Sequence, residues 1–185
     1  MNELNRITPE QFKNQTKTPL IVILDNVRSM NNIGSIFRTC DAFVVEKLYL
    51  CGITAKPPHK DITKTALGAT ESVDWEYVEN VVKLVQHLKQ NHTKVYLIEQ
   101  TDNSTFLQHF QFPEEKMAIV LGNEVFGVTE ELLAICDGAI EIPQHGTKHS
   151  LNVTIAAGIV IWERYRNFFS RKKTFLCRLF TYHTV

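Results

Sequence analysis

Apolar and polar positions along the chain form two kinds of segment that alternate. Short runs that are apolar at nearly every position are followed by stretches in which apolar residues recur every three or four positions. The first kind predicts buried β-strands, and the second predicts helices with one apolar face. Six runs are expected to be strands: 20–25, 47–52, 72–78, 94–99, 117–122 and 138–143.

Helical periodicity falls between these strands, at 33–44, 79–91, 129–136 and 151–168. Strands that are apolar throughout and alternate with helices predict an α/β fold, a mostly parallel sheet with helices on both faces. Residues 56–60, "KPPHK", are expected to form a loop. We therefore expect one domain over residues 1–168, with a short lead at 1–19 and an extension at 169–185.

The segment "LNVTIAAGIVIW" at 151–162 is apolar on almost every side. A helix of that kind is expected to be buried on more than one side. In a chain of 185 residues, such burial favours a helix that lies between the sheet and a partner subunit.

Charge is distributed unevenly, although the formal net charge is zero. Residues 164–185 contain six basic residues and no acidic one, which leaves a net charge of −6 on the first 163 residues. A basic tail favours a site for phosphates or an anionic surface, whereas the alternative is a solvated helix end whose cations complement the helix dipole. The aromatic residues among them are expected to pack on the body of the domain, with stacking on unpaired bases as the alternative. The six basic residues are Arg164, Arg166, Arg171, Lys172, Lys173 and Arg178.

The four cysteines lie far apart and form no CxxC pair, and no His cluster has metal-ligand spacing. This pattern favours reduced thiols in a cytoplasmic protein, and we expect no metal. No apolar run approaches the ~20 residues needed to cross a bilayer. The N-terminus also lacks the apolar stretch of a signal peptide.

Candidate chemistry lies in three loops that each follow a predicted strand. The first, "DNVRSMNNIGSIFR", contains Asn32, which can cap the helix after it; "GNEVFGV" contains Gly122 and Gly127; and "QHGTKHSLNV" places Ser150 at a helix N-terminus. Carboxyl ends of parallel strands meet at one edge of the sheet, and exposed N–H groups there suit a nucleotide-like ligand. Neither GxxxxGK[ST] nor GxGxxG is present.

Arg38 is an unusual residue for its predicted helix. It follows Phe37 beside the apolar face, and no acidic residue earlier in the run could pair with it. One interpretation is an arginine that extends from the helix edge into solvent. The other is a cation held for an anionic ligand.

Taken together, the three loops resemble a known family. "NNIGSIFRTCDAF" (31–43), "IVLGNEVFGVTEE" (119–131) and "IPQHGTKHSLNVTIAAGIVIWE" (142–163) resemble, in order and separation, the three signature blocks of the SpoU (TrmH-like) RNA ribose methyltransferases of the SPOUT superfamily. "KTALGATESVDW" (64–75) also looks typical of that family. The likeness covers residues 20–166.

The resemblance implies an enzyme that transfers the methyl group of S-adenosylmethionine to a ribose 2′-hydroxyl of tRNA or rRNA. It also implies a deep C-terminal trefoil knot and a homodimer formed through the knot region. By position, Arg38 and Asn32 match catalytic residues, while Glu124, Ser150 and Asn152 match residues that bind or position the substrate. The cofactor contacts implied in the same way are Leu121, Gly122, Asn123, Ile142, Pro143 and Leu151, with Glu99 and Thr101 beside the adenosine.

We expect Arg38 to clasp a phosphate and the ribose oxygen rather than to act as a base, because guanidinium stays protonated. Ser150 is expected to cap the last helix. His145 and His149 are alternative proton acceptors near neutral pH. Two other functions stay open: methylation of an RNA base, and RNA binding or assembly without catalysis.

Overall fold

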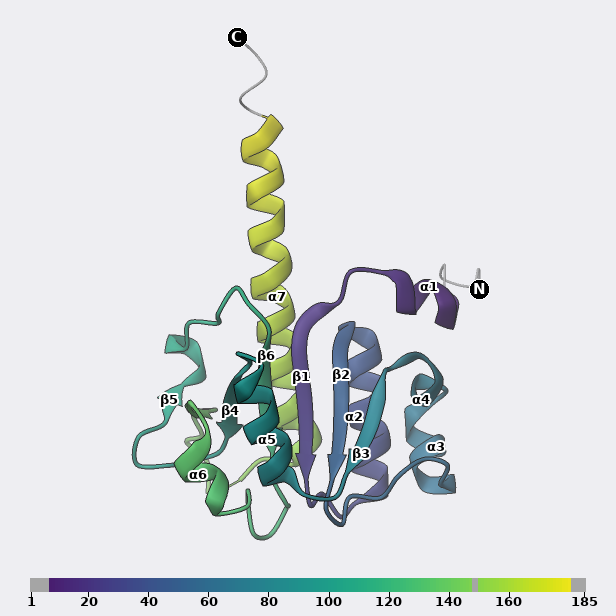
Figure 1. The fold of residues 1–185 in the computed structure, drawn as a ribbon, viewed down its shortest axis with the longest axis vertical. Coiled ribbons are helices and arrows are strands. Elements are labelled where there is room, and N and C mark those ends of the chain that lie inside the picture. The colour runs from purple at the N-terminus through teal and green to yellow at the C-terminus, as the bar shows by residue number, and fades with distance from the viewer. Residues whose placement is uncertain (1–6, 148–149, 181–185) are drawn as a thin grey trace.

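The chain folds around one parallel sheet (Figure 1). The computed structural model describes residues 7–147 and 150–180, with side chains up to Arg171. Seven strands pair in the order β3-β2-β1-β6-β4-β7-β5, and every pair is parallel. The strands are β1 (Thr18–Asp25), β2 (Val45–Cys51), β3 (Trp75–Val78), β4 (Lys94–Ile98), β5 (Thr105–Phe106), β6 (Met117–Leu121) and β7 (Gly138–Glu141).

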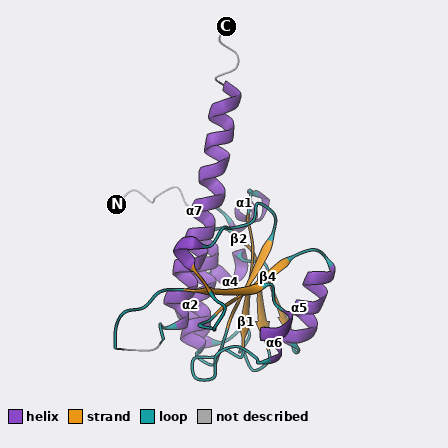
Figure 2. Ribbon diagram, turned by 90° about the vertical axis from the view of Figure 1, so that its left-hand side faces the viewer, coloured by secondary structure: helices purple, strands orange, loops and turns teal. Residues whose placement is uncertain are grey.

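Helices cover both faces of the sheet (Figure 2). One face carries α2 (Met30–Ala42), α3 (Lys60–Ala66), α4 (Ala69–Ser72) and α7 (Val153–Phe180). The other face carries α5 (Val81–Gln90) and α6 (Glu131–Ile135). A short α1 (Pro9–Asn14) precedes β1, and a 3-10 turn, η1 (Leu107–His109), follows β5.

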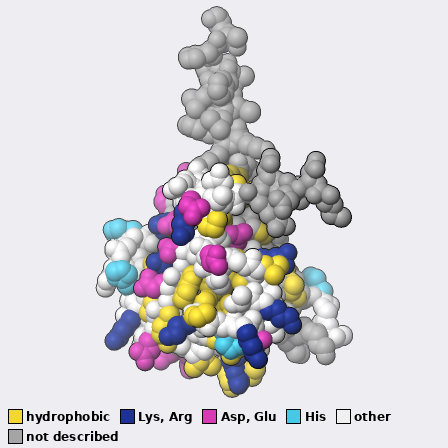
Figure 3. Space-filling view, turned by 90° about the vertical axis from the view of Figure 1, so that its right-hand side faces the viewer, with side chains coloured by type: hydrophobic (Ala, Val, Ile, Leu, Met, Phe, Trp, Pro, Cys, Tyr) yellow, Lys and Arg dark blue, Asp and Glu magenta, His cyan; other side chains and the backbone are white. Residues whose placement is uncertain are grey.

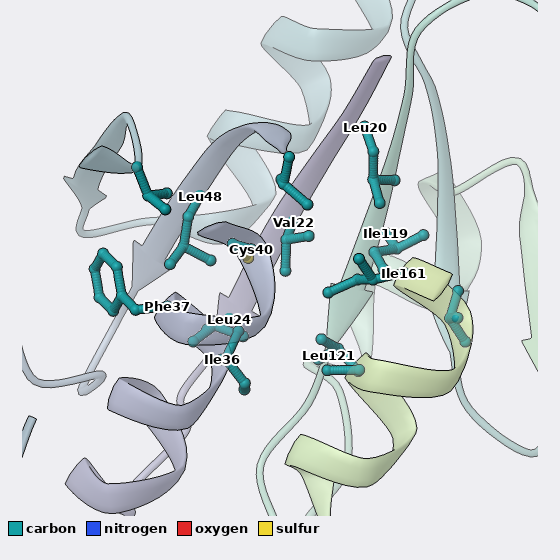
Figure 4. Close-up of a cluster of buried hydrophobic side chains, with 14 of the residues drawn as sticks. Leu20, Val22, Leu24, Ile36, Phe37, Cys40, Leu48, Ile119, Leu121 and Ile161 are labelled. Carbon is teal, nitrogen blue, oxygen red and sulfur yellow. The ribbon is translucent and has the colours of Figure 1, made fainter. Parts of the chain in front are cut away.

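The core forms two layers because side chains alternate along each strand. On β1, Leu20, Val22 and Leu24 point toward α2 and α7, while Ile21 and Ile23 point toward α5. Figure 4 shows the first layer, in which Ile36, Phe37 and Cys40 of α2 and Ile161 of α7 meet side chains of the sheet. The predicted doubly covered parallel sheet is therefore confirmed.

All six predicted strands are present, and the four predicted helices are present with shifted ends. The structure adds β5, α1, α3 and α4, which the periodicity does not predict. α1 belongs to the expected lead, where Thr8 and Gln11 form a capping box. The loop predicted at 56–60 is also present, but it ends at residue 59, because α3 begins at Lys60.

The helix predicted at 151–168 is longer than expected: α7 runs without interruption to Phe180, and its outer turns project beyond the sheet (Figure 1). Within the single chain its apolar surface is not buried all round, because Ile155 is 53% and Trp162 is 45% exposed. Among the described residues, no helix has the length and apolar composition needed to cross a bilayer.

Candidate active site

Three loops that are distant in sequence meet at the carboxyl edge of the sheet. They follow β1, β6 and β7. In the strand order β1-β6-β4-β7, β1 and β6 are neighbours, and β4 lies between β6 and β7. This is the edge at which parallel α/β sheets bind ligands. The arrangement brings the polar residues of all three predicted blocks to one region.

Glu124 joins the loop after β6 to the start of α2. Its carboxylate accepts hydrogen bonds from Asn32 Nδ2 at 3.0 Å, from the N–H of Arg28 at 3.2 Å and from the N–H of Ser29 at 3.4 Å. Glu124 therefore fixes the two loops relative to each other through three contacts across more than 90 positions of sequence.

These donors determine the charge state of Glu124. Partial burial acts to raise the pKa of the carboxyl, but the hydrogen bonds from Asn32 and from backbone N–H groups outweigh it and hold the pKa below its usual value. Glu124 is therefore an anion at neutral pH, and it can orient Asn32 without supplying a proton.

Asn152 brings the third loop to the same cluster. Its Nδ2 lies 3.5 Å from Asn32 Oδ1, a long hydrogen bond, while its Oδ1 accepts from the N–H of Thr154 at 2.9 Å. Asn152 therefore caps α7, and the prediction that Ser150 caps this helix is wrong, because α7 begins at Val153. Likewise Ser29, not Asn32, caps α2, which begins three residues earlier than predicted.

The loop after β6 is fixed by its own backbone. The N–H of Asn123 donates to Gly127 O at 2.7 Å, and the N–H of Gly127 donates back to Asn123 O at 3.0 Å. Gly127 has a φ of +71°, and a Cβ on Gly122 would lie 2.3 Å from the Gly127 carbonyl carbon. Both positions therefore require glycine, because a side chain at either would break this turn.

A pocket opens beside the cluster, between the loops after β4, β6 and β7. Six of the predicted cofactor residues line it, together with Glu124 and Ser150, whereas Pro143 and Thr101 do not. The six are Leu121, Gly122, Asn123, Ile142, Leu151 and Glu99. Sequence reasoning missed Glu141 and Gln100, which also line the pocket and are linked by a hydrogen bond of 3.3 Å.

The electrostatics of this pocket favour a cation. Among the described residues that line it, Glu99, Glu124 and Glu141 are acidic and none is lysine or arginine. The remaining walls are largely apolar, with Ile98, Ile140 and Val153 among them, and they lower the local polarity. A ligand with an apolar body and a net positive charge fits this composition.

Arg38 does not line this pocket in its own chain. It lies on the exposed side of α2, ~9 Å along the helix axis from Asn32, in a groove that also contains Lys64 and Thr65 of α3. The Arg38 side chain forms no hydrogen bond or ion pair with a described residue. The structure therefore unites Asn32, Glu124, Ser150 and Asn152 but not Arg38.

The basic tail is only partly available for an anionic partner. Arg164 is 1% exposed and donates to the carbonyl oxygens of Pro113 at 2.6 Å and Glu115 at 2.8 Å, so it is part of neither a phosphate site nor a solvated helix end. Burial, with Arg171 nearby, lowers the pKa of Arg164 to about 10. Arg166 pairs with Glu163, and Arg171 with Glu114. Side chains of the other three basic residues lie outside the described part.

Two further expectations concern proton acceptors and metals. His145 is exposed and does not line the pocket, and His149 lies outside the described residues. Among the side chains described, no three His, Cys, Asp or Glu residues are grouped closely enough to hold a metal ion. Basic side chains on the face that carries α3 and α4 are scattered rather than gathered in one stripe (Figure 3).

Comparison with known proteins gives consistent matches. The model of the SpoU rRNA Methylase family matches residues 19–162. A tRNA (guanosine(18)-2′-O)-methyltransferase of Thermus thermophilus is 30% identical over 164 residues, which are 89% of this chain and 83% of that relative. The crystal structure of a TrmH/SpoU tRNA modifying enzyme of Aquifex aeolicus superposes with a TM-score of 0.79 at 29% identity, covering 89% of this chain and 82% of that chain.

A second structure shares the fold and contains a ligand. The AdoMet-bound rRNA methyltransferase of Sinorhizobium meliloti has a TM-score of 0.75 at 24% identity, over 88% of this chain and 61% of that chain. AdoMet is S-adenosylmethionine.

Proposed function

The chain belongs to the SpoU rRNA methylase family, and on that premise we propose that it transfers the methyl group of S-adenosylmethionine to a ribose 2′-hydroxyl of tRNA or rRNA. The observation that carries the proposal is the cluster of Asn32, Glu124 and Asn152 at the mouth of the glycine-bearing pocket. Three chain segments supply it, and each contains one of the family's signature blocks.

The pocket suits this cofactor in shape and charge. S-adenosylmethionine supplies an electrophilic methyl carbon on a sulfonium, and it carries a net positive charge when bound. Leu121, Ile142 and Leu151 offer apolar walls, while Glu99 and Glu141 offer negative charge. The turn at Gly122 lets backbone approach the ligand closely.

On the substrate side, the chain must place and polarise a weakly acidic hydroxyl. Glu124 holds Asn32, and Asn152 contacts Asn32, so the two amides present a fixed set of donors and acceptors to a ribose. We assign Arg38 to a neighbouring phosphate and to the developing charge on the ribose oxygen. Its guanidinium stays protonated, so a phosphate oxygen or water accepts the proton.

We further propose a homodimer through the region of α7, with the trefoil knot of the family in the C-terminal half. Ile155 and Trp162 are exposed apolar residues on α7, and a second copy would cover them. Since Arg38 lies outside the pocket of its own chain, the dimer can also supply this residue to the opposite pocket. The cytoplasm is the proposed location, because Cys40, Cys51 and Cys136 are free thiols.

Methyl incorporation tests the function. The chain is incubated with total RNA and methyl-labelled S-adenosylmethionine, and the RNA is then digested to nucleosides. We expect label in 2′-O-methyl nucleosides. Label confined to bases would support the base-methylating alternative, and RNA binding without any label would support the non-catalytic one.

A further inference from the structure

A second hollow lies on the other side of the loop after β6. Its volume is ≈ 310 Å³, and it is bordered by the loops that follow β1, β2 and β6. β1 and β6 are neighbours in the sheet, yet β1 leads into α2 on one face and β6 leads into α6 on the other. Such a point, where the chain leaves the sheet in two directions, is the common ligand crevice of parallel sheets.

Buried polar contacts hold the three loops in place. Asp25 is fully buried and accepts hydrogen bonds from the N–H of Thr129 at 2.6 Å and from Asn26 Nδ2 at 2.7 Å. Asn26 accepts from the N–H of Ile53 at 3.1 Å, and its carbonyl accepts from Asn123 Nδ2 at 2.7 Å. The hollow is therefore preformed, and occupying it does not require the loops to order first.

Phe126 projects into solvent at the rim of this hollow, although its backbone is fixed. It is 81% exposed, and its N–H donates to Asn123 Oδ1 at 3.1 Å. Ile53, which is 65% exposed, also borders the hollow. Phe126 and Ile53 therefore form an apolar surface at the hollow that is exposed to solvent.

Arg28 adds a positive charge to the same hollow. Its side chain is exposed and makes no hydrogen bond or ion pair with a described residue, and no described residue lining the hollow is acidic. The backbone N–H of Arg28 donates to Glu124 in the candidate active site at 3.2 Å. The residue that carries this positive charge therefore contacts the proposed catalytic cluster directly through its backbone.

Resting on the proposed function, we propose that this hollow is a subsite for a nucleotide that flanks the methylated one in the RNA. The base stacks on Phe126 against Ile53, and Arg28 binds the adjoining phosphate. An exposed aromatic ring and a nearby cation match the base and the phosphate of a nucleotide. Every base has a π-face that can stack on the ring, and every phosphate linkage carries a negative charge that the cation can bind.

Binding of a short fluorescein-labelled single-stranded oligoadenylate, measured by anisotropy at low salt, tests the subsite. Phe126→Ala is expected to weaken binding about 5- to 150-fold, the range for loss of one stacked base. Phe126→Trp is expected to bind within about twofold of the wild type, since indole also stacks. Arg28→Ala is expected to reduce the slope of log affinity against log salt by about 0.7, the value for one phosphate contact on a single strand.

An abasic oligonucleotide of the same length isolates the stacking contact. With this probe Phe126→Ala and the wild type are expected to bind equally, because no base remains to stack. Leu133→Ala and Lys83→Ala are matched controls that remove an exposed apolar side chain and an exposed cation elsewhere. Both are expected to bind oligoadenylate as the wild type does.

Several results would overturn the subsite: equal binding of oligoadenylate by Phe126→Ala and wild type, an equal loss in Leu133→Ala, or no wild-type binding at all. Conversion of a dimer to a monomer by Phe126→Ala in light scattering would instead make this surface a protein interface, which also overturns it. The proposed function fails separately, if the wild type labels no ribose in total RNA while Phe126 is still needed for binding.

Discussion

Glu124 is the residue on which the arrangement of the site depends most directly, since it receives three donors from the loop after β1 and the first turn of α2. Glu124→Gln keeps the shape but removes the charge and turns one oxygen into an amide that faces N–H groups. We expect kcat/KM for methyl transfer to fall about 10- to 100-fold, the range for lost hydrogen bonds to a charged group. Glu130→Gln, an exposed neighbour, is the control and should leave kcat/KM unchanged.

The same carboxylate makes a pH-dependent contribution to stability. The pKa of Glu124 is lower in the folded chain than the usual 4.5. The ionised carboxylate therefore stabilises the fold at every pH above 4.5. By linkage, this contribution disappears as the pH falls through the lowered pKa. Urea denaturation of the wild type and Glu124→Gln should show a constant difference in unfolding free energy at neutral pH, which shrinks only in acid below 4.5. A difference that already shrinks between pH 7 and 5 would contradict the lowered pKa.

Substitutions of Arg38 separate two roles for its positive charge. If charge alone is needed, Arg38→Lys retains appreciable turnover, whereas a two-pronged clamp on phosphate and ribose oxygen loses most of it. Because the proposed role is the clamp, we expect both Arg38→Lys and Arg38→Ala to lose about 100-fold or more in kcat. Normal turnover in Arg38→Ala would refute both roles.

At the scale of elements, Arg164 connects α7 to the ends of two other segments. Its guanidinium donates to the carbonyl oxygens of Pro113, Glu115 and Pro19. Arg164→Met should lower the free energy of unfolding by about 2–5 kcal/mol, because buried carbonyls lose their donors. Arg166→Met, which breaks an exposed ion pair, should cost less than about 1 kcal/mol. Equal midpoints in urea for the two variants would show that Arg164 is not a structural clamp.

The elements with strong apolar patterns were predictable, and the others were not. β1 and β6 are buried along nearly their whole length, so their sequences are apolar throughout. β5 has two residues, both exposed, and α3 buries only Ile62 and Ala66. Elements this short or this exposed leave too few apolar positions to show a period.

The site was predictable from its blocks, but its hydrogen bonds were not. The residues Asn32, Glu124 and Asn152 follow from the resemblance, whereas the N–H donors of Arg28 and Ser29 come from backbone, which any residue offers. Arg164 was misjudged for the same reason: its partners are carbonyl oxygens, and these leave no trace in the sequence.

At the scale of the whole molecule, the position of Arg38 raises the question of which pocket it serves. Arg38→Ala and Asn152→Ala chains, each expected to lose activity alone, can be unfolded together, mixed equally and refolded. If Arg38 acts on the partner's pocket, each mixed dimer has one intact site, and about a quarter of wild-type activity returns. If Arg38 acts within its own chain, no site is intact. We expect recovery, and its absence in confirmed mixed dimers would assign Arg38 to its own pocket.

The unbroken course of α7 has a mechanical consequence. The helix has 28 residues, about 42 Å in length, and contains no proline. One end is capped by Asn152, which contacts Asn32, and the other lies beyond the sheet. We therefore expect a pull on the distant end to act along one continuous helix, past the anchor at Arg164, on the amide of Asn152 that contacts Asn32 beside the Glu124 carboxylate.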